Sequence, residues 1–146
     1  MTEFGLEVIV SADPKKLFDL AINFEEFKKV FPSQLKNIKI ISKSEHEVMT
    51  EDTLTFNTYF KNMEIHQKTI HKIQYPEITS HIVEGPFNHS IVHILFKELD
   101  EGTKVVCTVN LKIGIKYKIL SPVIKSKYKA ILSSLIYKIN NIATES

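Results

Sequence analysis

The sequence predicts an α+β fold in which a curved antiparallel sheet of seven strands wraps around one long C-terminal helix. One alternating segment opens the chain, and six more follow residue 35 with short polar turns between them, so that neighbouring strands run antiparallel. Residues 121–143 carry apolar side chains at helical spacing instead. Because the 146 residues include no low-complexity or linker-like stretch, we expect one domain spanning residues 1–146.

The N-terminal part predicts one strand and two short helices. Apolar and polar residues alternate over residues 3–10, which is typical of a strand with one buried face. Ser11-Ala12-Asp13-Pro14 is a helix-start signal, and Leu17 and Phe18 begin the apolar face of the helix that follows. A second short helix is expected from Phe24 to Val30, ended by Pro32.

The middle of the chain predicts the remaining six strands. Their residues are expected to be 35–40, 48–60, 63–73, 78–84, 90–96 and 104–117. Polar or glycine- and proline-containing turns separate them at Ser42-Lys43-Ser44-Glu45, Lys61-Asn62, Tyr75-Pro76, Gly85-Pro86 and Asp100-Glu101-Gly102.

The last helix is the element that the sheet has to cover. Ser121 is expected to be its N-cap, with Pro122 at the first helical position. At 1.5 Å per residue the helix would be about 33 Å long. Its apolar stripe comprises Ile124, Tyr128, Ile131, Leu132, Leu135, Ile139 and Ile142.

Charge is distributed unevenly along the chain. The net charge is +2, but residues 102–146 hold eight lysines and one acidic residue, Glu145. All 19 basic residues are lysines, which weighs against sequence-specific DNA binding because arginine is the usual reader of guanine edges. Six lysines bracket the start of the last helix: Lys112, Lys116, Lys118, Lys125, Lys127 and Lys129. They indicate either a dock for an anionic membrane, an acidic partner or RNA, or simply a solvated surface.

Several classes of protein are excluded or disfavoured. No stretch approaches 18 uninterrupted apolar residues and the chain does not begin like a signal peptide, so we expect a cytoplasmic protein. Cys107 is the only cysteine and is expected to be an apolar filler rather than a nucleophile. His89 and His93 lie four apart, which on a strand puts them on one face, but no carboxylate or third histidine has matching spacing, so no metal is expected. No glycine-rich phosphate loop appears, and no cofactor is predicted.

The chain resembles the START-like, helix-grip superfamily, which includes polyketide cyclase/aromatases and coenzyme-Q-binding proteins. The resemblance covers nearly the whole chain. It rests on Ser11-Ala12-Asp13-Pro14 before Leu17-Phe18-Asp19-Leu20, on Phe31-Pro32, on Glu84-Gly85-Pro86-Phe87 with Phe96 nine residues later, on Asp100-Glu101-Gly102-Thr103, and on the terminal helix. It implies an apolar cavity between the sheet and that helix.

Strand parity then gives the residues expected to line such a cavity. They are Phe56, Met63, Ile65, Gln67, Thr69, His71, Ile82, Ile94, Val109, Tyr128, Leu132 and Leu135. No catalytic set is evident, and His71 and Tyr128 are the candidates for proton transfer or for contacting a ligand oxygen. Their alternative roles are a histidine hydrogen-bonded within the sheet and a tyrosine that fills the core.

Three functions are compatible with these observations. The leading hypothesis is binding of a hydrophobic small molecule or lipid, as a carrier or a sensor. The first alternative is a polyketide cyclase/aromatase-like enzyme in which His71, Gln67 or Tyr128 assists proton transfer. The second is a ribosome, RNA or protein interaction module that uses the lysine-rich C-terminal third, similar to the ribosome-associating toxins of the same superfamily. Ligand identity, oligomeric state and pathway stay open.

Overall fold

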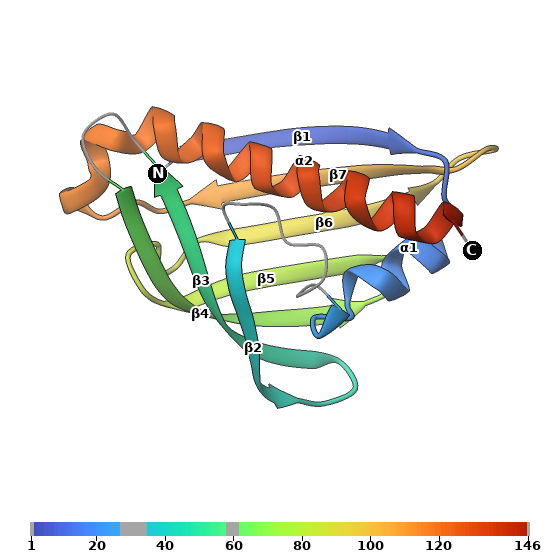
Figure 1. Cartoon of the computed structure of the whole chain (residues 1–146), viewed down its shortest axis with the longest axis horizontal. Helices are drawn as coiled ribbons and strands as arrows, with labels where there is room; N and C mark the ends of the chain where they lie inside the picture. Colours follow the sequence, from blue (N-terminus) through green and yellow to red (C-terminus); the bar gives the residue numbers. More distant parts are fainter. Residues whose placement is uncertain (1, 27–34, 58–61, 146) are drawn as a thin grey trace.

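The computed structural model describes residues 2–26, 35–57 and 62–145, which form seven strands and two α-helices (Figure 1). The strands are β1 (Thr2–Val10), β2 (Leu35–Lys43), β3 (Glu47–Asn57), β4 (Asn62–Gln74), β5 (Glu77–Glu84), β6 (Ile91–Glu98) and β7 (Thr103–Leu111). The helices are α1 (Pro14–Ala21) and α2 (Ser121–Glu145), and a short 3₁₀ helix, η2 (Ile115–Leu120), precedes α2. In this part of the chain no helix is long and apolar enough to cross a bilayer.

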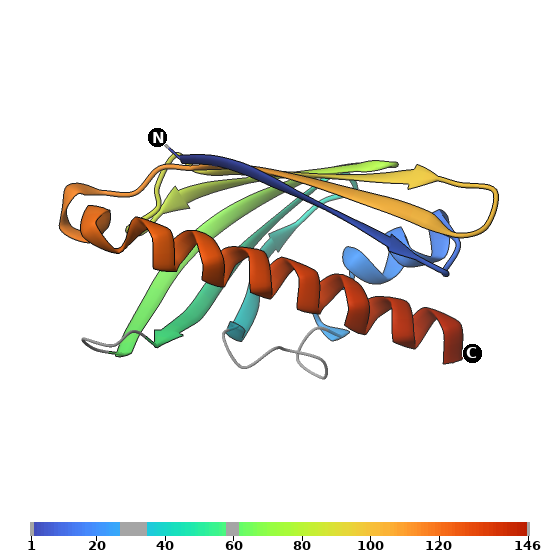
Figure 2. The ribbon, with the colours of Figure 1, turned by 90° about the horizontal axis from the view of Figure 1, so that it is seen from above.

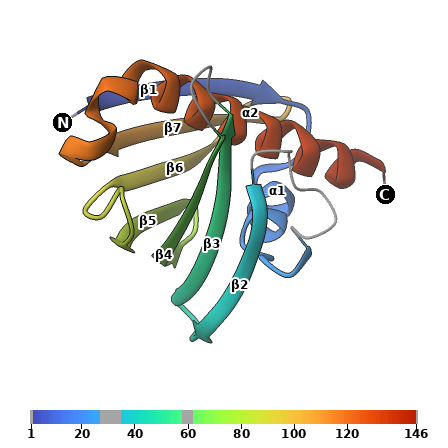
Figure 3. The same cartoon turned by 60° about the vertical axis from the view of Figure 1, so that its left-hand side comes forward.

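One antiparallel sheet contains all seven strands in the order β1-β7-β6-β5-β4-β3-β2. The sheet bends so strongly that β2 and β1 lie at the two ends of an arc, and α2 crosses its concave side (Figures 2 and 3). The predicted α+β architecture, a curved seven-stranded sheet around a long C-terminal helix, is therefore confirmed.

The concave face carries the core, as the alternation predicts. On β7 the inward positions Val105, Cys107, Val109 and Leu111 are fully buried, and the residues between them are partly or fully exposed. Hydrophobic side chains of β1, β3, β4, β5 and β6 join the same cluster. Burying these side chains is the main stabilising contribution to the fold.

Helix α1 begins as predicted. Asp13 is its N-cap, and its carboxylate accepts a hydrogen bond from the backbone N–H of Lys16 at 3.1 Å. Leu17 and Phe18 are buried, and the ring of Phe18 packs edge-to-face on Phe96 with centroids 5.5 Å apart. The second short helix predicted from Phe24 to Val30 lies mostly outside the described residues; Phe24 itself is buried.

The end of the last strand differs from the prediction. The alternation predicted β7 as far as Tyr117, but the strand ends at Leu111. Among the described residues, β1 pairs with β7 up to Leu111 and β6 pairs with it only up to Asn110. At Lys112 the backbone N–H donates to the hydroxyl of Ser90 at 2.7 Å instead of continuing the ladder.

The start of α2 is also different. Ser121 already has helical backbone angles (φ −48°, ψ −46°), and its hydroxyl donates to the carbonyl oxygen of Lys118 at 2.7 Å. An N-cap would have an extended backbone and would accept a bond from a backbone N–H. The prediction that Ser121 caps α2 is therefore wrong, because η2 leads directly into the helix.

His89 does not lie on β6 as predicted. It is in the turn between β5 and β6, with φ +78°. The turn also contains Gly85 at φ +114°, where a Cβ atom would lie 2.8 Å from the carbonyl oxygen of His66. Because His89 precedes the strand, it does not share a strand face with His93, which instead lies 2.9 Å from a carboxylate oxygen of Glu77.

Two hydrogen bonds at Ala12, one buried and one partly buried, connect the beginning of the chain to its end. The N–H of Ala12 donates to Oδ1 of Asn140 on α2 at 2.9 Å, and its carbonyl oxygen accepts from the hydroxyl of Thr103 on β7 at 2.7 Å. Ala12 and Thr103 are both buried. The segment between β1 and α1 is therefore fixed to the sheet and to the second half of α2.

The first prediction concerns this tie. Asn140→Ala leaves the Ala12 N–H without its protein acceptor, so we expect the free energy of unfolding to fall by about 1–3 kcal/mol. Urea unfolding followed by circular dichroism measures the change. Asn141→Ala is the matched control because Asn141 is exposed on the same helix; equal losses in the two variants would contradict the role given to Asn140.

Candidate functional site

A cavity of about 170 Å³ lies between α2 and the concave face of the sheet. Its wall includes eight of the residues predicted from strand and helix parity: Gln67, Thr69, His71, Ile82, Ile94, Tyr128, Leu132 and Leu135. The wall also includes Ala21, Phe24, Leu35, Ile38, Asp52, Leu54, Ile78, Ser80, Val92, Phe96, Ile131, Ile136 and Ile139. Most of these side chains are aliphatic or aromatic, so the wall is predominantly apolar.

Four predicted lining residues are not on this wall. Phe56, Met63, Ile65 and Val109 are buried in the core beside it. Phe56 lies directly behind the wall, since its ring centroid is 5.9 Å from that of Tyr128 and 6.2 Å from that of Phe87. Parity places a residue on the correct face of the sheet, but it does not say whether neighbouring side chains cover that residue.

Six polar side chains gather on the concave face of three adjacent strands, and we call them the inner polar cluster. They are Thr50 and Asp52 on β3, Gln67, Thr69 and His71 on β4, and Ser80 on β5. The strand register brings them together, because Asp52 pairs directly with Gln67, Thr50 with Thr69, and His71 with Ser80. All but Thr50 contribute to the cavity wall.

Asp52 is at the centre of this cluster. Only 7% of the residue is exposed, and its Oδ2 accepts hydrogen bonds from the hydroxyl of Thr69 at 2.6 Å and the amide of Gln67 at 3.3 Å. Its Oδ1 accepts from the hydroxyl of Thr50 at 2.7 Å. Three donors directed at one side chain satisfy a carboxylate, which can only accept. Among the described residues no lysine or histidine forms an ion pair with it.

His71 extends the cluster as a directed chain of hydrogen bonds. Its Nε2 lies 2.8 Å from the hydroxyl of Thr50, and its Nδ1 lies 2.7 Å from that of Ser80. Because the Thr50 hydroxyl already donates to Asp52, it accepts from Nε2–H of His71. Nδ1 then accepts from Ser80, which assigns the neutral Nε2–H tautomer from the network. Both ring nitrogens are thus occupied by protein partners.

Burial favours the same neutral form. Desolvation lowers the pKa of His71 to about 4, and the nearby Asp52 carboxylate opposes this shift without cancelling it. The ring of Phe24 packs on the imidazole with centroids 4.5 Å apart. Of the two alternatives that the sequence leaves open for His71, the geometry is that of a histidine hydrogen-bonded within the sheet that also contributes to the cavity wall.

Two buried polar atoms at the cavity make no hydrogen bond with any other described residue. They are Oε1 of Gln67 and the hydroxyl of Tyr128, on residues that are 7% and 6% exposed. Burial, with a smaller contribution from Asp52, raises the pKa of Tyr128, and hydrogen bonding to the nearby Gln67 side chain lowers it. The hydroxyl therefore stays protonated at neutral pH. The two side chains are close, but they do not have the geometry of a formed hydrogen bond. A buried polar atom without a partner costs free energy, and a ligand could remove that cost.

The sequence analysis missed Thr50, Asp52 and Ser80. Thr50 and Asp52 have the same parity as Leu54, which is a buried position of β3. A carboxylate at an inward position of a strand is an unusual signal, because charged side chains are seldom fully buried. The alternation of residues 48–56 therefore already indicates that Asp52 is unusual.

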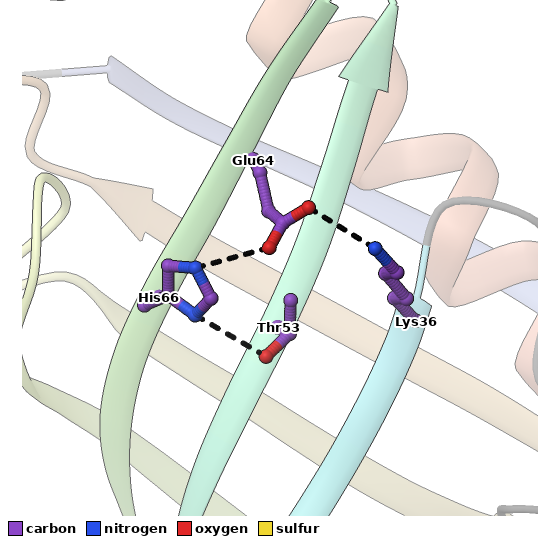
Figure 4. Close-up of polar contacts among 4 residues, drawn as sticks. All are labelled: Lys36, Thr53, Glu64 and His66. Atoms are coloured by element: carbon purple, nitrogen blue, oxygen red, sulfur yellow. Dashed lines mark hydrogen bonds and ion pairs between the residues drawn. The ribbon is translucent and has the colours of Figure 1, made fainter.

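A second polar group lies on the opposite, convex face and is exposed (Figure 4). Glu64 on β4 contacts Nζ of Lys36 on β2 and Nε2 of His66, both at 3.1 Å, and His66 lies 3.4 Å from the hydroxyl of Thr53 on β3. A hydrogen bond from Lys36, together with its charge, lowers the pKa of Glu64. Because solvent screens these contacts, we assign them no more than a cross-strand role.

Cys107 and the candidate metal ligands give no further site. Burial raises the pKa of the Cys107 thiol to about 12, so it is not a nucleophile at neutral pH. Within the described residues no three His, Cys, Asp or Glu side chains converge as metal ligands.

Comparison with known proteins gives structural relatives only. No protein-family model matches the chain, and no curated protein matches it in sequence. TTHA0849 from Thermus thermophilus superposes with a TM-score of 0.83 at 16% identity, covering 99% of this chain and 100% of the other. The ZhuI aromatase/cyclase from Streptomyces sp. R1128 superposes with a TM-score of 0.77 at 13% identity, covering 94% of this chain and 93% of the other. A START superfamily protein from Mycobacterium smegmatis superposes with a TM-score of 0.72 at 11% identity, covering 96% of this chain and 98% of the other.

The chain has the START-like, helix-grip fold. The expected resemblance is confirmed at the level of the fold, over almost the full length of the described relatives. In this helix-grip chain the cavity wall is formed by strands β2–β6 on one side and by α2 residues that include Tyr128, Leu132 and Leu135 on the other.

The second prediction concerns the protonation of His71. The pKa of His71 is about 4 in the folded chain and about 6.5 in the unfolded chain. Between about pH 4 and pH 6.5, therefore, His71 is protonated in the unfolded state but not in the folded state. Its contribution to stability is therefore complete above about pH 6.5 and is lost as the pH falls toward 4. Histidine ring chemical shifts followed by NMR give the midpoint, with His71→Gln to assign the resonance. A midpoint at or above 6.5 would contradict the assignment.

Proposed function

We propose that this chain binds a compact apolar molecule bearing a hydrogen-bond donor, in the cavity between α2 and the sheet. The observation that carries the proposal is the combination of an apolar wall with two buried polar atoms, Gln67 Oε1 and the Tyr128 hydroxyl, that have no hydrogen-bond partner in the part of the chain that the structure describes. Ligand sites typically combine apolar lining with a few placed polar groups that fix orientation.

The size of the cavity favours a ring-sized ligand over a long chain. An apolar cavity of about 150 Å³ in another protein is large enough to bind benzene. The volume here, about 170 Å³, is of the same order. A long acyl chain would need additional space, so we propose a compact molecule rather than an extended lipid.

The polarity of the wall selects the ligand's functional group. Asp52 places a negative charge at the wall, and Oε1 of Gln67 can only accept hydrogen bonds. His71, held neutral, offers no compensating positive charge. A hydroxyl or amine on the ligand would find acceptors, whereas a carboxylate would be repelled by Asp52.

The structural relatives support a function in the cavity without naming the ligand. One of them is described as an aromatase/cyclase. An enzyme of that kind is our second candidate, favoured by the Tyr128 hydroxyl, a protonated group without a partner at the cavity wall. We prefer simple binding because His71, the other candidate for proton transfer, already has both nitrogens bonded. The choice between carrier and sensor, and the cytoplasmic location, stay predictions.

The third prediction tests occupancy of the cavity with 2-naphthol, a two-ring alcohol. We expect saturable one-to-one binding by isothermal titration calorimetry, and Leu135→Trp should weaken it at least about tenfold because the indole fills the space. Tyr137→Trp is the matched control, since Tyr137 is exposed on the same helix. No saturable binding of 2-naphthol, together with no extractable ligand in the purified protein, would contradict the proposal.

The fourth prediction tests the negative wall. We expect 2-naphthoate to bind at least about 100-fold more weakly than 2-naphthol, because its carboxylate would be buried beside that of Asp52. Asp52→Asn should narrow the difference, whereas Glu51→Gln, at an exposed position next to it, should not. Equal affinities for the two compounds would show that the wall does not select by charge.

A further inference from the structure

Two large apolar side chains protrude from the segment before α2. Ile115 is 92% exposed and Ile119 is 88% exposed, and none of the residues of η2 is buried. We call residues 112–120 the basic tip. Exposing isoleucine side chains to water is unfavourable. Two of them within one short 3₁₀ helix therefore indicate a surface that is covered by an apolar partner.

Lysines surround this pair. Lys112, Lys116 and Lys118 are exposed on the basic tip itself. Lys125 and Lys129 on the first turns of α2 lie farther back, with each Nζ 5.7 Å from the centre of the Phe4 ring. From residue 102 to residue 144 the chain has no acidic residue to offset these charges.

We infer that the basic tip docks on an anionic lipid bilayer, with Ile115 and Ile119 entering the interface and the lysines contacting the headgroups. A bilayer surface combines negative charge with an apolar layer beneath it, which matches both features of the tip. RNA or an acidic protein surface would match the lysines but would leave two isoleucines without an apolar environment. The inference does not rest on ligand binding in the cavity.

The tip also lies near one end of the cavity. The ring of Tyr117 in η2 packs on Phe87 with centroids 6.5 Å apart, and Phe87 packs on Tyr128 at 5.7 Å. Tyr128 is part of the cavity wall. Docking of the basic tip would therefore bring one end of the cavity close to the bilayer, in which apolar molecules dissolve.

The first experiment measures binding to vesicles by sedimentation. Phosphatidylcholine vesicles with and without 30% phosphatidylserine (about 30% is enough to give a negative surface) are compared. We expect binding only to the anionic vesicles, reduced at least about tenfold by Ile115→Ser/Ile119→Ser and at least about tenfold by Lys116→Gln/Lys118→Gln. The matched controls are Ile9→Ser, at a 67% exposed isoleucine on β1, and Lys39→Gln/Lys43→Gln, at exposed lysines on β2.

The second experiment places a probe in the tip. Because the chain contains no tryptophan, an Ile119→Trp variant carries a single indole fluorophore. We expect its emission to shift to the blue on anionic vesicles and to be quenched by lipids brominated on the acyl chain, whereas an Ile9→Trp variant should show neither change.

Three results would overturn the inference. The first is wild-type binding that is equal for neutral and anionic vesicles or absent from both. The second is loss of binding with the lysine changes but not with the isoleucine changes, together with no quenching, which would leave only an electrostatic surface such as one for RNA. The third is a dimer in analytical ultracentrifugation that the isoleucine changes dissociate without affecting vesicle binding, which would assign the tip to a second copy of the chain.

Discussion

The fold depends on a mismatch between the width of the sheet and the width of one helix. Seven strands spaced about 4.8 Å apart span about 29 Å, whereas a helix with its side chains is about 10 Å across. A flat sheet would leave most of its apolar face uncovered, so the sheet bends around α2 and α1 covers a further part. Even so, the helix and strands β2–β6 do not pack together completely, and the remaining space is the cavity.

That incomplete closure makes the inner polar cluster possible. A carboxylate deep in a filled core would need every acceptor site satisfied by protein, and burying its charge would be costly. At the cavity wall Asp52 receives three hydrogen bonds from β3 and β4 side chains and keeps one side toward the space. The hydrogen bonds run in one sense from Ser80 through His71 and Thr50 to Asp52, so reversing any one of them would require the others to reorient.

Much of the fold could be predicted because strand alternation and turn residues are local signals. The strands, helix α1 and the long C-terminal helix follow from them, and parity placed Gln67, Thr69 and His71 together on the concave face. The parts that could not be predicted depend on tertiary partners. The alternation continues past Leu111, yet β7 ends there, where its pairing with the described residues of β1 and β6 also ends. Ile115 therefore has the parity of a core residue in the predicted strand and is exposed in the structure.

The candidate site was predictable only in part, for a related reason. Parity separates the two faces of the sheet but does not say which inward residues reach the cavity, so Phe56 and Val109 were expected there and are buried in the core without lining it. Asp52 has the inward parity of β3, so its position follows from the alternation, but its burial depends on donors that the fold brings from β3 and β4.

The two ends of α2 are held by different kinds of force. Near its C-terminal end, the hydrogen bond from Ala12 to Asn140 fixes distance and direction. Near its N-terminal end, Tyr128 is held by ring contacts with Phe56 and Phe87, which can slide without breaking a directional bond. Displacing the C-terminal end of α2 would break a directional hydrogen bond, whereas displacing the end at Tyr128 would only shift ring contacts. Admitting a molecule should therefore cost least near Tyr128.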